Sequence, residues 1–159
     1  MIVAGGENVA PVPIEEDIKS EMVDIVSHVM VVGDKRKHLA VIITFKTVLN
    51  EKNQPTDILS EPVQQWLATF DSKATTAAEM IKEDNDDVKK YIMDAIKRSN
   101  TRAVSNASKI HKFMIAPTDF SLAGGELTPT LKVKRHYVAE KYEKEIEEMY
   151  QYEVMSSMW

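Results

Sequence analysis

The chain has 159 residues, a formal net charge of −5 and no cysteine, and 43% of its residues are hydrophobic. This length suits one domain with its own core, and the acidic balance argues against a general binder of nucleic acids or membrane surfaces. The lack of cysteine excludes disulfides, a thiol nucleophile and cysteine-based metal sites, and it fits a reducing compartment.

The first third of the chain predicts a short strand, a helix and a pair of strands. Residues 1–4 form a strand-like piece that runs directly into Gly5 and Gly6, and a start inside an apparent element suggests a fragment of a longer protein. A helix is expected to begin at Pro13, with acidic residues 15–17 at its positive end. Two antiparallel strands are expected over residues 28–33 and 38–45, on either side of a polar turn.

The middle third reads as mostly helical. Residues 50–57 predict a polar loop around Pro55, and helices are expected near residues 61–70 and 75–83. The clearest helical pattern covers residues 86–110, where an apolar stripe begins at Val88 and continues through Ala107. Acidic residues 84–87 stand where this helix should begin, so helix capping explains them better than a cation site.

The last third predicts a strand over residues 112–116, a glycine-containing loop over 118–130 and a helix over about 136–150. Strands interleaved with helices favour an α+β (α/β) fold, with a small mixed three-stranded sheet and a short N-terminal strand or hairpin, packed with helices. We expect one domain over residues 1–150. The tail, residues 151–159, carries no recognisable motif and is expected either to be disordered or to pack on a partner.

General catalytic signatures are missing from the sequence. It contains no phosphate-binding loop, no dinucleotide-binding glycine pattern and no nucleophile elbow. The four histidines are His28, His38, His111 and His136, and no pair has the spacing of a zinc site on one helix face. We interpret them as ordinary surface or strand-end residues and predict no metal site. No apolar run approaches the roughly 20 residues of a membrane helix, and no secretory signal is visible.

Two glycine-containing loops stand out. One covers residues 4–11 (AGGENVAP) and the other covers residues 124–135 (GGELTPTLKVKR). Paired glycines let a backbone approach a ligand closely, and loops often carry function. The plainer interpretation is a pair of tight turns and a solvated basic edge.

These loops carry a resemblance to a known family. Residues 4–15 resemble the glycine-containing loop that follows the hinge in adenylate-forming acyl-CoA synthetases. Residues 31–37 resemble the next strand and turn of the long-chain and very-long-chain members, and residues 125–135 resemble their final lysine motif. Residues 138–150 resemble their last helix. The order of motifs is similar to that of the bubblegum type of synthetase over nearly the whole chain.

That resemblance implies the C-terminal lid subdomain of an ATP-dependent long-chain fatty acid–CoA ligase, which would make acyl-CoA, AMP and pyrophosphate. A large N-terminal domain, absent from this sequence, would bind ATP, Mg²⁺ and the fatty acid, while the lid would alternate between an adenylating and a thioester-forming pose. ATP, Mg²⁺ and CoA are thus expected in the full-length enzyme. This chain alone is expected to be inactive and to bind none of them tightly. The parent is expected in the cytoplasm, and its peripheral association with membranes stays open.

The lysine motif implies two catalytic residues. Lys132 would be the adenylation lysine, and Arg135 follows it three positions later, as in the family pattern. Many relatives have glycine before this lysine, whereas this chain has Leu131, so Lys134 remains the competing candidate. A cation is needed here because a carboxylate must approach a triphosphate, and an ammonium between them offsets their repulsion.

Two further groups would meet CoA. The resemblance implies that the pantetheine channel is lined by Gly5, Gly6, Glu7 and Asn8. Glycine suits such a channel because a side chain would block the thiol, although a turn with positive φ would also favour it. Contacts to the CoA phosphates could come from Lys35, Arg36 and Lys37, which otherwise form a solvated turn.

Two other functions remain open from the sequence. A stand-alone, non-enzymatic CoA- or partner-binding module could reuse the same fold, and it would bind CoA without a large domain. A nucleic-acid binder would use residues 35–37 and 132–135, but the acidic total argues against it.

Overall fold

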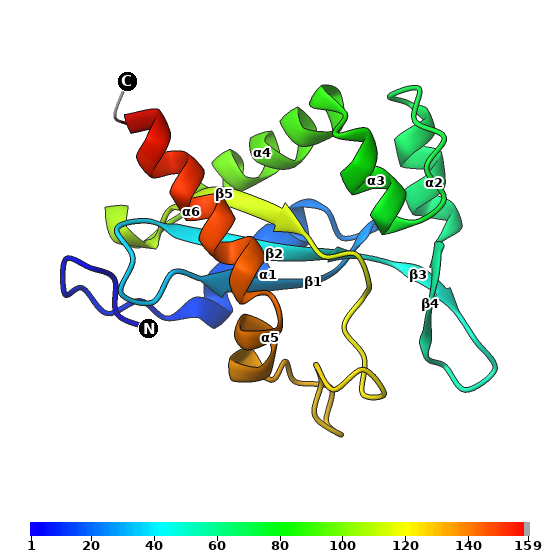
Figure 1. Cartoon of the computed structure of the whole chain (residues 1–159), viewed down its shortest axis with the longest axis horizontal. Helices are drawn as coiled ribbons and strands as arrows, with labels where there is room; N and C mark the ends of the chain where they lie inside the picture. Colours follow the sequence, from blue (N-terminus) through cyan, green and yellow to red (C-terminus); the bar gives the residue numbers. More distant parts are fainter. Residues whose placement is uncertain (158–159) are drawn as a thin grey trace. The chain divides into compact units, whose positions relative to one another are not determined.

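The computed structural model describes the backbone of residues 1–157 and the side chains of residues 1–151. It divides into two compact units, Met1–Asp119 and Phe120–Trp159, which are taken in turn (Figure 1). The elements are α1 (Pro11–Glu21), β1 (Val26–Val32), β2 (Leu39–Phe45), β3 (Thr47–Leu49), β4 (Pro55–Leu59), α2 (Glu61–Ala68), α3 (Ala77–Glu83), α4 (Asp86–Asn100), η1 (Asn106–Ser108), β5 (Ile110–Ile115), α5 (Arg135–Lys141) and α6 (Glu143–Ser157). None of the described helices is long and apolar enough to cross a bilayer.

A mixed sheet of three strands, in the order β1-β2-β5, organises the first unit (Figure 1). β1 and β2 are antiparallel, with Val31 opposite Val41, because a short turn joins them. β2 and β5 are parallel, with Val41 opposite Phe113, and the intervening chain carries α2, α3 and α4. The predicted α+β fold with a small mixed sheet is therefore confirmed.

α1 and α4 build the core on one face of this sheet. The apolar residues of α4 recur at helical spacing, namely Val88, Ile92, Ala95 and Ile96. Alternate strand residues meet them, namely Val29, Val31, Leu39, Val41, Ile43 and Phe45. Ile18 of α1 and Ile92 of α4 are fully buried, and burying a side chain of this size contributes about 1.5–3 kcal/mol.

α1 begins earlier than predicted, at Pro11, which occupies the first turn and needs no hydrogen-bond acceptor there. Residues 15–17 consequently lie beyond the first turn, and the prediction that they complement the positive helix end is wrong. Instead the Glu15 carboxylate accepts a hydrogen bond of 2.7 Å from the backbone N–H of Val31, on the outer side of edge strand β1.

α4 ends at Asn100, ten residues before the predicted end. The side-chain amide of Asn100 forms two hydrogen bonds of 2.8 Å with the backbone of Ile110. It donates to the C=O of Ile110 and accepts from its N–H. Val104, predicted to continue the apolar stripe, is 95% exposed. At the other end, Asn85 accepts from the N–H groups of Asp87 and Val88, which confirms the predicted capping role of this segment.

The predicted loop over residues 50–57 is instead part of a hairpin formed by β3 and β4. The side chain of Asn50 closes its turn by accepting from the N–H groups of Lys52 and Gln54 at 2.8 and 3.0 Å. Pro55 is the first residue of β4, a position where a missing N–H is tolerated in a strand.

In the second unit, the predicted single C-terminal helix is two helices, α5 and α6, separated at Tyr142. Neither proline nor glycine marks this break, so the apolar spacing alone predicts continuity. α6 extends through Ser157, past the predicted domain boundary at residue 150. Of the predicted tail, the backbone of residues 151–157 belongs to α6, whereas residues 158–159 and the side chains of 152–159 lie outside the described residues.

Candidate functional site

The first glycine loop is a tight turn at the start of the first unit. Gly6 donates its N–H to the carbonyl of Val3 at 2.9 Å, and Val3 donates to the carbonyl of Glu7 at 3.1 Å. Ile2 and Asn8 pair across the turn as an antiparallel bridge. Val3 and Val9 are buried in the core and therefore anchor both ends of an otherwise exposed loop.

The basic turn lies directly beside this glycine loop. Ala4 donates to the carbonyl of Arg36 at 2.8 Å, and Lys35 donates to the carbonyl of Ile2 at 2.6 Å. The Asp34 carboxylate accepts from the N–H of Ile2 at 3.0 Å. The structure thus joins Gly5, Gly6, Glu7 and Asn8 with Lys35, Arg36 and Lys37, although about 30 residues separate the two groups in the sequence.

The two glycines of the loop differ in backbone conformation. Gly6 has a φ of 84°, a region that favours glycine, whereas Gly5 does not lie in that region. A Cβ added at either position would meet no atom within 4 Å. The backbone conformation of the turn is therefore sufficient to explain a glycine at position 6. At position 5 no backbone angle requires glycine, and the space that a Cβ would occupy is open.

A hollow of about 550 Å³ adjoins the same loop. Its lining includes Glu7 and Asn8 of the loop, Asp17 of α1, and Ser99 and Arg102 at the end of α4. The loop and the end of α4 therefore share one surface, which carries both acidic and basic groups.

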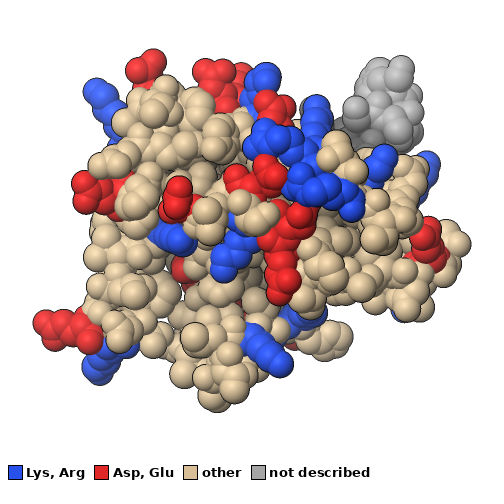
Figure 2. All heavy atoms as spheres, turned by 180° about the vertical axis from the view of Figure 1, so that it is seen from behind, with Lys and Arg blue, Asp and Glu red and all other residues tan. Residues whose placement is uncertain are grey.

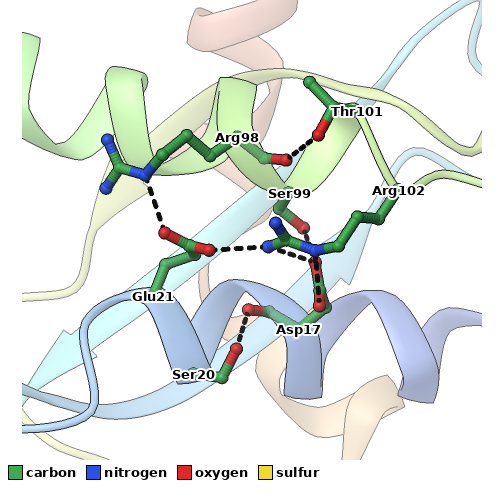
Figure 3. A network of polar contacts seen from close by, with 7 residues as sticks. All are labelled: Asp17, Ser20, Glu21, Arg98, Ser99, Thr101 and Arg102. Atoms are coloured by element: carbon green, nitrogen blue, oxygen red, sulfur yellow. Dashed lines mark hydrogen bonds and ion pairs between the residues drawn. The ribbon is translucent and has the colours of Figure 1, made fainter.

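An ion-pair network ties α1 to the end of α4 (Figure 3), and two of its members, Asp17 and Arg102, also line this hollow. Arg102 contacts both Asp17, at 3.0 Å, and Glu21, at 2.7 Å, while Arg98 also donates to Glu21 at 2.7 Å. The hydrogen bond from Arg102 lowers the pKa of Asp17, and the hydrogen bond from Arg98 is the main cause that lowers the pKa of Glu21. Both carboxylates are consequently ionised at neutral pH.

Charge on the face drawn in Figure 2 is mixed. Figure 2 shows acidic and basic side chains interleaved across the middle of the face that it draws. A nucleic-acid binder is expected to present a basic stripe, so this face gives no support to that alternative.

Lys132 lies in a small hairpin of the second unit. Leu127 and Val133 pair as a bridge, and Thr128 donates its N–H to the carbonyl of Lys132 at 2.8 Å. Leu131 takes a positive φ of 64° at the tip, which closes the turn from Thr128. Lys132 is exposed, and its ammonium has no ion-pair partner among the residues that the structure describes.

The competing lysine lies on the same edge. Residues two apart in an extended segment project to the same side, and Lys132 and Lys134 are both exposed while Val133 is half-buried between them. Lys134 donates its N–H to the carbonyl of Glu126 at 2.7 Å and precedes α5. The carbonyl of Lys134 accepts from the N–H of Val138 at 3.0 Å, and Arg135 is the first residue of that helix.

The second glycine pair, Gly124 and Gly125, directly precedes Glu126 at the start of this hairpin. The Glu126 carboxylate is 2% exposed, accepts from the N–H of Ser121 at 3.2 Å and lies 3.5 Å from the ammonium of Lys141. A Cβ on Gly124 would collide with both oxygens of that carboxylate, and Gly125 has a φ of 89°. These glycines are explained by the turn itself, as the plainer interpretation of the sequence held.

A buried polar cluster was missed by the sequence analysis. Asp119 accepts hydrogen bonds from Ser27 Oγ at 2.7 Å, Thr44 Oγ1 at 2.7 Å and His28 Nδ1 at 3.1 Å. Burial by itself would raise the pKa of Asp119, but the hydrogen bonds from His28, Thr44 and Ser27 outweigh it and lower that pKa. His28 is thus a partner of a buried carboxylate and not an ordinary strand-end residue.

The sequence of this chain is similar to that of known proteins. Residues 1–85 and 72–154 match the family model described as the AMP-binding enzyme C-terminal domain. The long-chain-fatty-acid–CoA ligase ACSBG2 of Gallus gallus is 46% identical over 94% of this chain, and the ligase ACSBG1 of Homo sapiens is 42% identical over 98%. The chain spans only 20% and 21% of the lengths of these two relatives.

Solved structures agree in fold. The adenylation domain of a carboxylate reductase from Mycobacterium chelonae has a TM-score of 0.68, with 19% identity, over 95% of this chain and 19% of its own. The corresponding domain from Segniliparus rugosus, solved with AMP and a co-purified carboxylic acid, has a TM-score of 0.65 and 17% identity over 95% of this chain and 19% of its own.

Proposed function

Because this chain belongs to the AMP-binding enzyme C-terminal domain family, we propose that it is the catalytic lid of an ATP-dependent long-chain fatty acid–CoA ligase. The observation that carries this proposal is the 42–46% identity to named ligases over nearly the whole chain. These relatives favour a ligase over a free-standing CoA-binding module. Their greater length supports a large N-terminal domain elsewhere in the parent protein, where we place the ATP, Mg²⁺ and fatty acid sites.

The lid would contribute Lys132 to the first half-reaction. Adenylation brings the fatty acid carboxylate toward the α-phosphate of ATP, so two anions approach each other. An ammonium between them offsets this repulsion by roughly 4 kcal/mol at about 4 Å and an effective dielectric constant near 20. An effect of that size, present only in the transition state, is worth about a thousandfold in rate. The exposed hairpin position of Lys132 suits a group that must reach a substrate held by another domain.

The glycine loop would contribute to the second half-reaction. The open space at Gly5 fits the passage of a pantetheine arm, and the neighbouring Lys35 and Lys37 are exposed cations that suit the CoA phosphates. Arg36 lies between Lys35 and Lys37 in the basic turn, and Arg135 follows Lys132 by three positions in the lysine motif. We place the parent protein in the cytoplasm, with any attachment to membranes arising outside this chain.

The test compares Lys132→Ala with Lys134→Ala in the full-length protein. Acyl-adenylate formation is measured from fatty acid and ATP, and thioester formation is measured separately from supplied acyl-adenylate and CoA. Lys132→Ala should slow the first half-reaction about a thousandfold and leave the second nearly unchanged. Lys134→Ala, the matched control, should leave both rates close to those of the wild type. A selective loss in Lys134→Ala would transfer the role to that residue, and two active variants would refute a lysine in this hairpin.

A further inference from the structure

The cluster around Asp119 lies where the chain leaves the first unit, of which Asp119 is the last residue. The Asp119 side chain is 7% exposed. Both of its carboxylate oxygens are occupied, because Oδ1 accepts from Thr44 and His28 while Oδ2 accepts from Ser27. Three donors on two neighbouring strands therefore hold one carboxylate.

The donors are themselves fixed by the sheet. Thr44 also accepts the backbone N–H of His28 at 3.0 Å, which ties β1 to β2 through the hydroxyl that then donates to Asp119. Just before Asp119, Ala116 donates its N–H to the carbonyl of Ile43 at 3.0 Å, so the exit segment is attached to β2 at two points. A buried carboxylate that meets three donors constrains position tightly, because losing any partner leaves a buried polar group unsatisfied.

Asp119 is anchored directly before the segment that leads to Lys132. Phe120 begins the second unit, and Lys132 follows Asp119 by thirteen residues. The anchored exit is therefore the point at which the segment that carries Lys132 is joined covalently to the first unit. A displacement of about 1 Å between a catalytic group and its substrate can cost roughly a hundredfold in rate, even when the change is remote from the chemistry.

We infer that Asp119, held by Ser27, His28 and Thr44, is a positioning residue for the adenylation half-reaction. It acts by fixing the exit of the segment that carries Lys132, and it does not touch the substrates. This inference rests on the proposed function of Lys132. It predicts a selective effect, because the second half-reaction depends on the glycine loop of the first unit and not on the reach of Lys132.

The experiment uses Asp119→Asn in the full-length protein. This change keeps the shape of the side chain but replaces one of its two accepting oxygens with an amide NH₂, so at least one of the three donors loses its acceptor. We expect kcat for acyl-adenylate formation to fall about tenfold with KM for ATP changed by less than about twofold. Thioester formation from supplied acyl-adenylate should stay within about twofold of the wild type. Asp71→Asn is the matched control, because Asp71 is exposed and its φ of 60° is one that asparagine tolerates.

The outcomes separate the two proposals. Equal losses in both half-reactions, or wild-type rates in Asp119→Asn while Lys132→Ala is inactive in adenylation, would overturn the positioning role alone. An active Lys132→Ala would overturn the proposed function and the positioning role together. If Asp119→Asn does not fold, Ser27→Ala and Thr44→Val each remove a single donor. Either variant should then show the same selective loss to a smaller degree, and wild-type behaviour of both would refute the inference.

Discussion

Gly5 and Gly6 occupy one exposed turn, yet a methyl group should act differently at each. An L residue at the φ of 84° found for Gly6 is strained by about 1–2 kcal/mol, whereas Gly5 has neither that strain nor a neighbour within 4 Å of an added Cβ. Gly6→Ala should therefore lower the free energy of unfolding by about 1 kcal/mol, and Gly5→Ala should leave it within about 0.5 kcal/mol. Urea unfolding of the two variants measures the difference.

Two substitutions of Gly5 test its channel role in the full-length protein. If Gly5 lines a passage for pantetheine, Gly5→Val should slow thioester formation by about tenfold or more without changing adenylate formation. Gly5→Ala, with less bulk, should show a smaller effect in the same direction. Full thioester activity in both variants would leave Gly5 as a turn residue only.

Individual site residues were predictable to different degrees. Motif order led to Lys132 and to the glycine loop, and the structure adds that the glycine loop and the basic turn share backbone hydrogen bonds. The Asp119 cluster could not be found from sequence, because His28 and Asp119 are 91 positions apart and no local pattern links them. Only the sheet register brings Ser27, His28 and Thr44 to one carboxylate.

At the scale of elements, the contact between α1 and α4 should depend on pH. The pKa values of Asp17 and Glu21 lie below their ordinary values of 3.8 and 4.5 because arginines donate to them. As the pH falls, the unfolded chain therefore takes up protons first, and the stabilisation is lost as the pH passes through the lowered folded values. The network should contribute fully above about pH 5 and progressively less below about pH 4.

Arg102→Gln tests this dependence. The variant should unfold at a slightly lower temperature than the wild type at pH 7, since half-exposed ion pairs contribute little. The difference between the two proteins should shrink as the pH falls through the lowered pKa values of Asp17 and Glu21 and both carboxylates take up protons. A difference that persists unchanged at low pH would show that Arg102 acts through packing of its stem.

Elements with strong apolar patterns were predicted well, and their ends were not. β1, β2, β5 and α4 all follow runs of core-forming residues. The end of α4 depends on Asn100 reaching Ile110, and the β3–β4 hairpin depends on a turn closed by Asn50, so each is determined by a side chain-to-backbone bond. Hydrophobic periodicity does not report such bonds.

For the whole molecule, the isolated 159-residue chain is expected to lack ligase activity. The chain spans about a fifth of the relatives that it matches, and the proposed nucleotide site lies in the remainder. Incubation with fatty acid, ATP, Mg²⁺ and CoA should give no acyl-adenylate and no acyl-CoA above background. Turnover by this chain alone would contradict the division of labour proposed above.

The parallel pairing of β2 with β5 also bears on synthesis of the protein by the ribosome. β1 and β2 can pair as soon as both have emerged from the ribosome. However, 64 residues separate Phe45, the last residue of β2, from Ile110, the first residue of β5. At translation rates of about 5–20 residues per second, the free edge of β2 would wait roughly 3–13 seconds for its partner. During that interval β2, which is almost entirely apolar, exposes unpaired backbone N–H and C=O groups along one edge. We expect the nascent chain to depend most on a chaperone in this interval, because such an edge can pair with other chains.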